Sequence, residues 1–295
     1  MNLAQVEAFV AVAETGSIGN AAHRLGLTQP AVTRQIQSLE QALGTTLLDR
    51  RSKPSTLTPS GRIALEHCRH LLKVLTELKE SVNEISTPSG NFRLGIAFGA
   101  TDLVLSEPID LLRKGYPEVK VEVIADWTGN LIRQTEAGAI DAAIILRPHD
   151  KAPAPELHGR ALGQDEIVVV ASKREKLSPN SQISALEGYS WVMNPKGCWY
   201  RDLLQQILSR ASIPFQIAIE TFGLEYQLSL ISRGVGLGFV PGWAVERSAY
   251  RKDLKMISLA ECKLELTVWS IQAGYVGRLR AALHTLEDAI SKNIR

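Results

Sequence analysis

Glutamine, threonine and arginine side chains recur along one side of the stretch LTQPAVTRQIQSLEQALG, residues 27–44. At the spacing of an α-helix, the side chains that share this face are Gln29, Thr33, Arg34, Gln37 and Gln41. Amide and hydroxyl groups both donate and accept hydrogen bonds, and a guanidinium adds paired donors. This chemistry recognises a partner by the partner's own pattern of donors and acceptors. The alternative is a solvated face, although such a face usually carries more Glu and Lys pairs.

The residues around this face predict the elements that hold it in place. The apolar stripe on its opposite side consists of Val32, Ile36, Leu39 and Leu43. The stripe of an earlier helix consists of Leu3, Val6, Val10 and Ala13. A short helix is predicted between them, with Ala21, Ala22 and Leu25 facing inward.

Glycines and capping residues mark the ends of these helices. Gly16 and Gly26 are expected to end the first two helices, and Ser17 and Thr28 to cap the second and third. Pro30 falls in the first turn of the third helix, where its missing N–H costs nothing. Short helices joined by tight turns are typical of a helix-turn-helix. The basic stretch LLDRRSKPSTLT (47–58) then predicts a small hairpin.

Composition narrows the class of protein. The chain has 295 residues, which suggests two or three domains, and its formal net charge is only +2. Between Arg24 and Arg62, however, six basic residues stand against two acidic ones, which favours an anionic partner there. The three cysteines lie far apart, and neither a disulfide framework nor a metal-binding pair is expected. We find no signal pattern and no apolar run long enough to span a membrane, and therefore expect a cytoplasmic protein.

Catalytic, cofactor and metal motifs are not found in this sequence. There is no HExxH, P-loop or GxSxG motif, and no spacing pairs Ser, His and Asp. The segment GVGLG (234–238) follows a helical stretch and leads into a strand, which is the reverse of a dinucleotide-binding context. His67 and His70 are three residues apart, but Cys68 is the only further ligand nearby, so they are expected to face solvent or an interface. We expect no metal, no cofactor and no enzyme activity.

A long helix is predicted from Pro59 to about Ile85. Its apolar residues are spaced 4, 3, 4, 3, 4 and 3 apart: Ala64, Cys68, Leu71, Leu75, Leu78, Val82 and Ile85. This is the seam of a coiled coil held for about three heptads, and it favours dimerisation over packing within one domain. The turn-rich stretch STPSGN (86–91) is expected to be a linker.

The remaining residues predict an α/β domain. Apolar, β-rich runs at 93–98, 119–125, 141–146, 166–171, 216–220 and 264–271 alternate with helical stretches. Strands buried on both faces with helices between them predict a mainly parallel sheet, and about 200 residues suit two lobes. The chain is expected to cross between the lobes at 160–166 and 263–267. Ligands collect at the carboxyl ends of such strands, here near 98–101, 126–129, 194–200 and 221–223.

The chain resembles the LysR-type transcriptional regulators along its whole length. The segment AAHRLGLTQPAVTRQIQSLEQALGTTLLDR (21–50), followed by LTPSGR (57–62), matches the signature of that family, and GVGLGFVP (234–241) resembles its glycine-rich segment. The sequence GCWY (197–200) departs from the short polar residues that many members have at this place. The resemblance implies a winged helix-turn-helix at 1–58, a dimerising linker helix at 59–87 and an effector-binding domain at 88–295. Lobe I would comprise 91–162 and 267–295, and lobe II would comprise 163–266.

The resemblance also implies roles for individual residues. The side chains expected to bind DNA bases or phosphates are Thr28, Gln29, Pro30, Ala31, Thr33, Arg34, Gln37, Ser38, Arg50, Arg51 and Lys53. Those expected to contact an effector between the lobes are Thr101, Thr128, Lys196, Gly197, Cys198, Trp199 and Phe222. Thr101 and Thr128 could equally serve only as helix caps. Threonine hydroxyls, helix N-termini and Lys196 favour a small organic anion such as a carboxylate.

The function expected is therefore effector-controlled, sequence-specific binding of a partly palindromic DNA site by a dimer or tetramer. Two other classes of protein remain as alternatives. A solute-binding protein would share the two-lobed domain, but it would have no use for the helix-turn-helix. An enzyme fused to a regulatory head would need a catalytic constellation, which we do not find.

Overall fold

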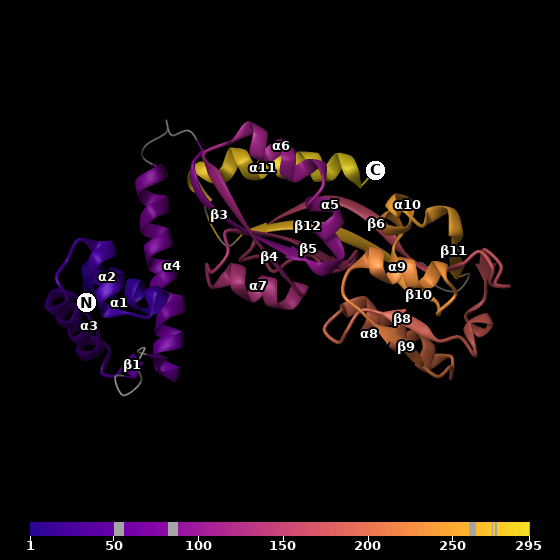
Figure 1. The fold of residues 1–295 in the computed structure, drawn as a ribbon, viewed down its shortest axis with the longest axis horizontal. Coiled ribbons are helices and arrows are strands. Elements are labelled where there is room, and N and C mark those ends of the chain that lie inside the picture. The colour runs from indigo at the N-terminus through magenta and orange to yellow at the C-terminus, as the bar shows by residue number, and fades with distance from the viewer. Residues whose placement is uncertain (50–55, 82–87, 260–263, 273, 275, 295) are drawn as a thin grey trace.

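The computed structural model describes residues 1–49, 56–81, 88–259, 264–272, 274 and 276–294. An N-terminal head lies against one long helix, and an elongated α/β domain lies on the other side of that helix (Figure 1). The head and the α/β domain each have their own buried hydrophobic cluster. The expected division into a helical head, a linker helix and an α/β domain is thus present.

Three helices form the head. They are α1 (Leu3–Thr15), α2 (Ile18–Leu25) and α3 (Gln29–Leu43). Gly16 and Gly26 end the first two helices in the left-handed conformation, with φ of 65° and 64°, as predicted. Ser17 caps α2 by accepting the amide of Asn20 at 3.4 Å. Thr28 stands at the N-cap of α3, but its side chain makes no capping hydrogen bond.

The apolar stripe of α3 packs into the centre of the head. Val32, Ile36 and Leu39 are at most 1% exposed, which confirms their predicted burial. Leu43 is 45% exposed, so the stripe ends one turn earlier than predicted. The reason is local, because Gly44 ends the helix directly after Leu43 and the chain turns away.

The hairpin and the long helix follow the head. The hairpin consists of β1 (Leu48–Asp49) paired antiparallel with β2 (Thr56–Leu57). The described part of the long helix is α4 (Pro59–Ser81), which begins at the predicted proline. Val82 and Ile85 of the predicted seam lie outside the described residues.

One long strand, β6 (His158–Ser172), runs through both lobes of the α/β domain. In lobe I it pairs with β12 (Glu265–Gln272). Residues 158–166 of β6 pair with β12, whereas residues 167–172 pair with strands of the other lobe. The partner of β6 thus changes between Glu166 and Ile167, a few residues beyond the division expected at 162/163.

The other elements of the domain belong to one lobe each. Lobe I contains β3 (Gly90–Ala97), η1 (Phe98–Ala100), α5 (Thr101–Val104), α6 (Glu107–Gly115), β4 (Val119–Asp126), α7 (Thr128–Glu136), β5 (Ala142–Pro148), η4 (Gly277–Leu279) and α11 (Arg280–Asn293). Lobe II contains β7 (Asn180–Ser181), η2 (Ile183–Leu186), β8 (Trp191–Met193), α8 (Trp199–Arg210), β9 (Ile217–Glu220), α9 (Leu224–Ser232), β10 (Gly238–Pro241), α10 (Gly242–Arg247), η3 (Arg251–Asp253) and β11 (Leu254–Leu259). Helices α6 and α11 lie side by side along one face of lobe I, and α7 lies on the opposite face (Figure 1).

The sheet is mixed, which corrects the prediction of a mainly parallel one. The strand order is β4-β3-β5-β12-β6-β11-β7, with β10 also paired to β6 and with β8 and β9 as a separate pair. Among the described strands, only β3, β4 and β5 in lobe I, and the pairs β8/β9 and β7/β11 in lobe II, are parallel. β6 and β12 run in opposite directions, and their pairings with each other and with β5, β10 and β11 are antiparallel.

An ion pair fastens the last helix to the crossing strand. Arg160 on β6 donates to Glu287 at 2.8 Å and to Asp288 at 2.6 Å, both on α11. The side chain of Glu287 is 5% exposed and that of Arg160 is 45% exposed. Removal of Arg160 would leave a buried carboxylate without this cation.

We expect Arg160→Met to lower the free energy of unfolding by about 1–3 kcal/mol, less than for a fully buried pair because Arg160 is partly solvated. Urea denaturation followed by circular dichroism measures the change. Adding Glu287→Gln should restore part of the loss, because a neutral amide is cheaper to bury than a lone carboxylate. A single variant as stable as the native chain would show that this ion pair contributes nothing.

Candidate functional site

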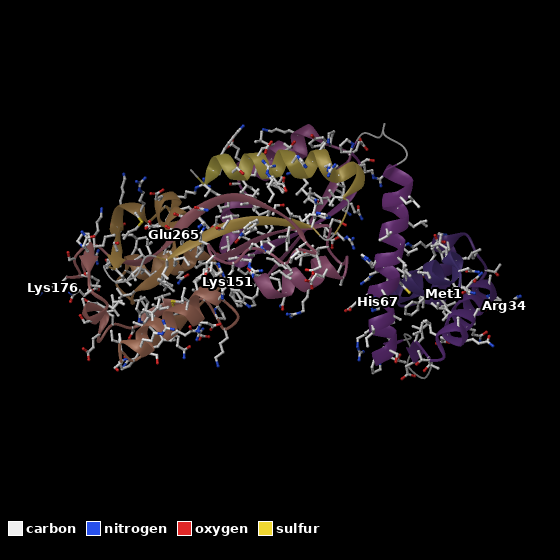
Figure 2. The ribbon with its side chains drawn as sticks, turned by 180° about the vertical axis from the view of Figure 1, so that it is seen from behind. Met1, Arg34, His67, Lys151, Lys176 and Glu265 are labelled. Atoms are coloured by element: carbon white, nitrogen blue, oxygen red, sulfur yellow. The ribbon has the colours of Figure 1, made fainter. Side chains whose placement is uncertain are left out.

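The polar face of α3 is presented to the outside of the head. Arg34 lies on the side of the head that is remote from α4 and from the α/β domain (Figure 2). The exposed residues predicted to contact DNA are Thr28, Gln29, Pro30, Arg34, Gln37 and Ser38, and the half-buried ones are Ala31 and Thr33. Thr33 donates its hydroxyl proton to the carbonyl of Gln29, at 2.9 Å. Its oxygen and methyl group remain for a partner.

Close packing between α2 and α3 positions the start of this face. A Cβ atom at Gly19 of α2 would lie 3.1 Å from the side-chain nitrogen of Gln29. The glycine therefore allows the Gln29 side chain to lie against α2. Gln29 and Pro30, in the first turn of α3, remain exposed at the surface of the head.

The segment LTPSGR fixes the hairpin to α4. Thr58 donates its hydroxyl proton to the Thr46 carbonyl at 2.8 Å and accepts the amide of Gly61 at 2.9 Å, which caps the helix. A Cβ atom at Gly61 would lie 2.0 Å from the Leu47 carbonyl oxygen, so only glycine fits. Glu40 of α3 accepts the amides of Leu47 and Leu48 at the base of the hairpin. The predicted phosphate contacts Arg50, Arg51 and Lys53 lie outside the described residues.

The long helix α4 has two different apolar faces. Ala64 and Cys68 pack against the head of their own chain, and Cys68 is 5% exposed. They are therefore not available to a partner helix, which corrects the predicted seam in its first half. Leu75 is half-buried. The large apolar side chains that α4 leaves exposed are Ile63 (61%), Leu71 (47%), Val74 (46%) and Leu78 (60%).

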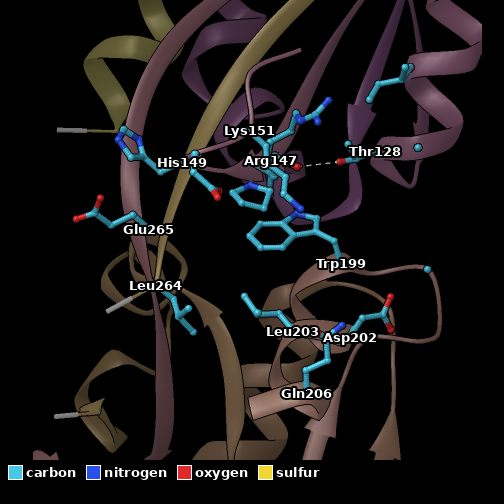
Figure 3. A pocket seen from close by; sticks show the side chains of 16 residues that line it. Thr128, Arg147, His149, Lys151, Trp199, Asp202, Leu203, Gln206, Leu264 and Glu265 are labelled. Carbon is cyan, nitrogen blue, oxygen red and sulfur yellow. Dashed lines mark hydrogen bonds between the residues drawn. The ribbon is translucent and has the colours of Figure 1, made fainter. Parts of the chain in front are cut away.

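A pocket of about 800 Å³ opens between the two lobes (Figure 3). Its lobe I wall consists of the start of α7, the end of β5 and the turn that follows, through Lys151. Its lobe II wall consists of Gly197 and the first two turns of α8. Leu264 and Glu265, where the chain crosses back between the lobes, close one end. The indole of Trp199 stands in the middle of the pocket, between the residues of the two walls (Figure 3).

Three of the predicted effector residues line this pocket: Thr128, Gly197 and Trp199. Neither Thr101 nor Thr128 is a helix cap, contrary to that alternative. Thr101 donates to the Phe98 carbonyl at 2.6 Å, and Thr128 donates to the Leu146 carbonyl at 3.2 Å (Figure 3). The N-cap of α7 is Trp127, without a side-chain capping hydrogen bond, and Asp126 before it accepts the amide of Trp127 at 2.7 Å. The predicted residue Lys196 is exposed and does not line the pocket.

A second, much smaller hollow also borders Trp199. It measures about 20 Å³ and is bordered by the 97–99 segment, Trp127 and the 197–200 segment, so Cys198 belongs to this hollow. Phe98 and Trp127 of lobe I meet Phe222 of lobe II, with ring centroids 4.8 to 6.0 Å apart. Gly197 contacts the same Trp127 ring, since a Cβ atom there would lie 2.7 Å from it. Aromatic contacts therefore hold the lobes together here, and little space is left for a ligand.

A buried network supports the 194–200 loop. Asn194 donates to the Tyr200 hydroxyl and to the Cys198 sulfur. Arg201 donates to the Asn194 carbonyl at 2.7 Å and pairs with Glu220 at 2.6 Å. Burial raises the pKa of the Cys198 thiol and raises the pKa of Tyr200 well above its usual value. Both groups therefore stay protonated at neutral pH, and Cys198 is a structural thiol rather than a reactive thiolate.

Several pocket residues were not predicted from the sequence. Charged or polar ones are Arg147, His149, Asp150, Lys151, Asp202, Gln206 and Glu265. The stretch RPHDK (147–151) directly follows the buried strand β5, and its sudden change to charged residues could have drawn attention to it. A loop rather than a helix follows this strand, so the stretch lacks the strand-to-helix junction on which the prediction of ligand-binding residues rests.

Two further features concern metal binding and membrane-spanning helices. Within the described residues, no group of three potential metal ligands occurs, and His67 and His70 are exposed on α4. None of the described helices combines the length and hydropathy needed to cross a membrane.

Known proteins with similar sequences and folds identify the family. Residues 3–62 match the family model of the bacterial regulatory helix-turn-helix proteins of the lysR family, and residues 86–287 match that of the LysR substrate binding domain. The regulator YofA of Bacillus velezensis is 29% identical over 88% of each chain, and the regulator IlvR of Caulobacter vibrioides is 27% identical over 98% of this chain and 96% of its own.

Solved structures agree in fold. A full-length variant of OxyR from Pseudomonas aeruginosa aligns over 98% of this chain and 94% of its own, with a TM-score of 0.78 and 19% identity. CbnR, in a complex with its target DNA, aligns over 98% of this chain and all of its own, with a TM-score of 0.60 and 20% identity. The two family models cover the head and most of the α/β domain, in the order seen in the structure. The chain therefore belongs to the LysR family of DNA-binding transcription regulators.

Proposed function

We propose that this regulator reads DNA through α3 and responds to a small molecule held between its lobes. The observation that carries the proposal is the interlobe pocket. Its two walls belong to different lobes, so they approach each other when the lobes close. A ligand that contacts both walls binds the closed arrangement better than the open one, so it shifts the population toward closure. The described chain offers no catalytic constellation to make the same pocket an active site.

The polar face of α3 suits the major groove of DNA. Gln29 offers a donor and an acceptor for adenine, and Arg34 offers paired donors for guanine or a phosphate. The hairpin residues Arg50, Arg51 and Lys53 supply charge for phosphates. Two heads related by a two-fold axis would read a partly palindromic promoter site, in the cytoplasm, where the DNA lies.

We expect Arg34→Ala to weaken binding to the specific site by about 1–3 kcal/mol and to leave binding to random DNA almost unchanged. Lys53→Ala should weaken binding to all sequences and reduce the salt slope by about one unit. Fluorescence anisotropy with a site selected from random DNA measures both. Gln35→Ala, on another face of the same helix, is the matched control. Equal losses on specific and random DNA for Arg34→Ala would refute base reading.

The exposed apolar face of α4 suits a second copy of the chain. Leu71, Val74 and Leu78 follow one another at steps of three and four, which is the spacing of a coiled-coil seam. With Ile63 they form an apolar strip on the side of α4 that its own head leaves exposed. The proposed assembly is a dimer through these helices, or a tetramer made of two such dimers.

We expect Leu71→Asp combined with Leu78→Asp to convert the dimer to monomers, because each buries a charge that costs several kcal/mol. Analytical ultracentrifugation measures the mass in solution. Thr76→Asp adds a charge on another face of the same helix and should keep the dimer. A dimer that persists in the double variant would place the interface elsewhere.

The charge of the pocket favours a ligand with a carboxylate. Arg147 is half-buried at the end of β5, and its guanidinium makes no hydrogen bond or ion pair with the described residues. Lys151 lies in the same wall. Arginine binds carboxylates through paired N–H donors, which fixes both position and orientation. Arg147 thus takes the role that the sequence had suggested for Lys196.

We expect small carboxylates to bind at least about tenfold more tightly than their neutral amides, which corresponds to roughly 1.4 kcal/mol. Isothermal titration calorimetry of the full chain measures the preference. Arg147→Gln should abolish it, whereas Lys196→Ala, outside the pocket, should leave it intact. Amides that bind as well as carboxylates would overturn the choice of an anionic ligand group.

A further inference from the structure

The interlobe pocket contains acidic as well as basic side chains, and all of its Arg and Lys residues lie on the lobe I wall. Lobe I contributes Arg147 and Lys151, together with Asp150. Lobe II contributes Asp202, the only charged residue among the described ones that line that wall, and Glu265 lies at the crossing between the lobes. A simple anion bound at Arg147 would therefore meet a carboxylate when the lobes close. Like charges brought together in a site that loses water oppose closure.

Arg147 and Asp202 are the two groups best suited to meet a ligand from opposite sides. Neither side chain makes a hydrogen bond or an ion pair in the part of the chain that the structure describes. Other arginines of the same domain do, since Arg93, Arg160 and Arg201 each pair with a carboxylate. The pocket thus has an unengaged cation on lobe I and an unengaged anion on lobe II.

From this division of charge, and on the basis of the proposed effector function, we propose that the ligand is a small zwitterion, an amino acid with an apolar side chain. Its carboxylate pairs with Arg147 on lobe I, and its ammonium group pairs with Asp202 on lobe II. Each charge then meets its opposite, and both walls gain an interaction that exists only when the lobes approach. The charged groups of the ligand therefore supply the differential affinity that closure requires.

The remaining lining residues fit the apolar part of such a ligand. Ile132 and Leu146 of lobe I face Leu203 of lobe II across the pocket, and Leu264 closes one end. Trp199 offers a flat ring in the middle (Figure 3). Its indole nitrogen is buried without a hydrogen-bond partner among the described residues. A ligand carboxylate held at Arg147 would bring an acceptor to this side of the pocket.

The volume of the interlobe pocket sets a condition on how the ligand contacts both lobes. A pocket of about 800 Å³ is much larger than one amino acid, so the ligand can touch both walls only after the lobes move together. The aromatic contact of Phe98 and Trp127 with Phe222 already joins the lobes on the other side of Trp199. Closure therefore narrows the wide pocket while the hollow stays small.

Calorimetry of the full chain tests the proposal with leucine and two analogues that each lack one charge. Isocaproate is leucine without its ammonium group, and isopentylamine is leucine without its carboxylate. Phenylalanine, phenylpropionate and phenethylamine form a second set of the same design. In at least one set, the amino acid should bind at least about tenfold more tightly than either analogue.

Variants assign the two charges. Asp202→Asn should weaken binding of the amino acid about tenfold and leave binding of the analogue without the ammonium group unchanged. Arg147→Gln should weaken both ligands. Asp253→Asn, the same change at an exposed residue of lobe II outside the pocket, is the matched control and should change neither. Thermal unfolding of Asp202→Asn without ligand controls for its place in the first turn of α8, because a structural role would lower stability without changing the preference.

The outcomes separate this proposal from the more general one. If isocaproate and phenylpropionate bind as tightly as the amino acids, and Asp202→Asn changes nothing, the zwitterion is excluded while an anionic effector stands. If the amines bind best, both the zwitterion and the carboxylate are excluded. If neither amino acid binds, and neither isocaproate nor phenylpropionate binds, this proposal is overturned together with the carboxylate effector.

Discussion

The structure of the α/β domain depends on the pairing of β6 with β12. β6 is the only described strand that pairs with strands of both lobes, and β12 runs antiparallel to the lobe I half of β6. β6 changes its partners between Glu166 and Ile167, so each lobe is built on one half of the same strand. Asp165, next to this point, accepts the amides of Glu166 and Trp243, and a Cβ atom at Gly242 would lie 3.0 Å from it. The carboxylate thereby connects the crossing strand β6 to the start of α10.

The interlobe pocket follows from this connection. Leu264 directly precedes β12 and Glu265 begins it, and both line the pocket at the hinge between the lobes. The walls of the pocket come from β5 and α8, which are far apart in the sequence. Strands joined through a hinge can change the distance between the walls without breaking the hydrophobic core of either lobe. The aromatic cluster at Phe222 and the contact of Gly197 with Trp127 already bring the lobes together at one side. The proposed ligand would act on the side that is still open, where opposite charges face each other.

The head is built by a different principle, in which glycines permit close approach between short helices. Gly61 leaves room for the Leu47 carbonyl against α4, so the hairpin, α3 and the long helix form one rigid unit. A movement of α4 therefore carries the polar face of α3 with it. Two such heads joined through the exposed strip of α4 would have a spacing set by the helices, and a change of lobe arrangement at the other end of α4 could alter it.

The sequence by itself determined the features that rest on local periodicity and capping. The helices of the head, the glycines that end them, Pro59 at the start of α4 and most strands of the α/β domain depend on neighbours in the chain, and they are found where predicted. Features that depend on contacts between residues distant in sequence are set by the tertiary structure. Cys68 has the spacing of a seam residue but packs on its own head, because α1 happens to cover that face of α4. The direction of strand pairing, and the presence of Arg147 and Asp202 in the same pocket, arise only when β12 lies between β5 and β6. Periodicity describes which side of an element is buried, but it contains no information about which distant element will cover that side.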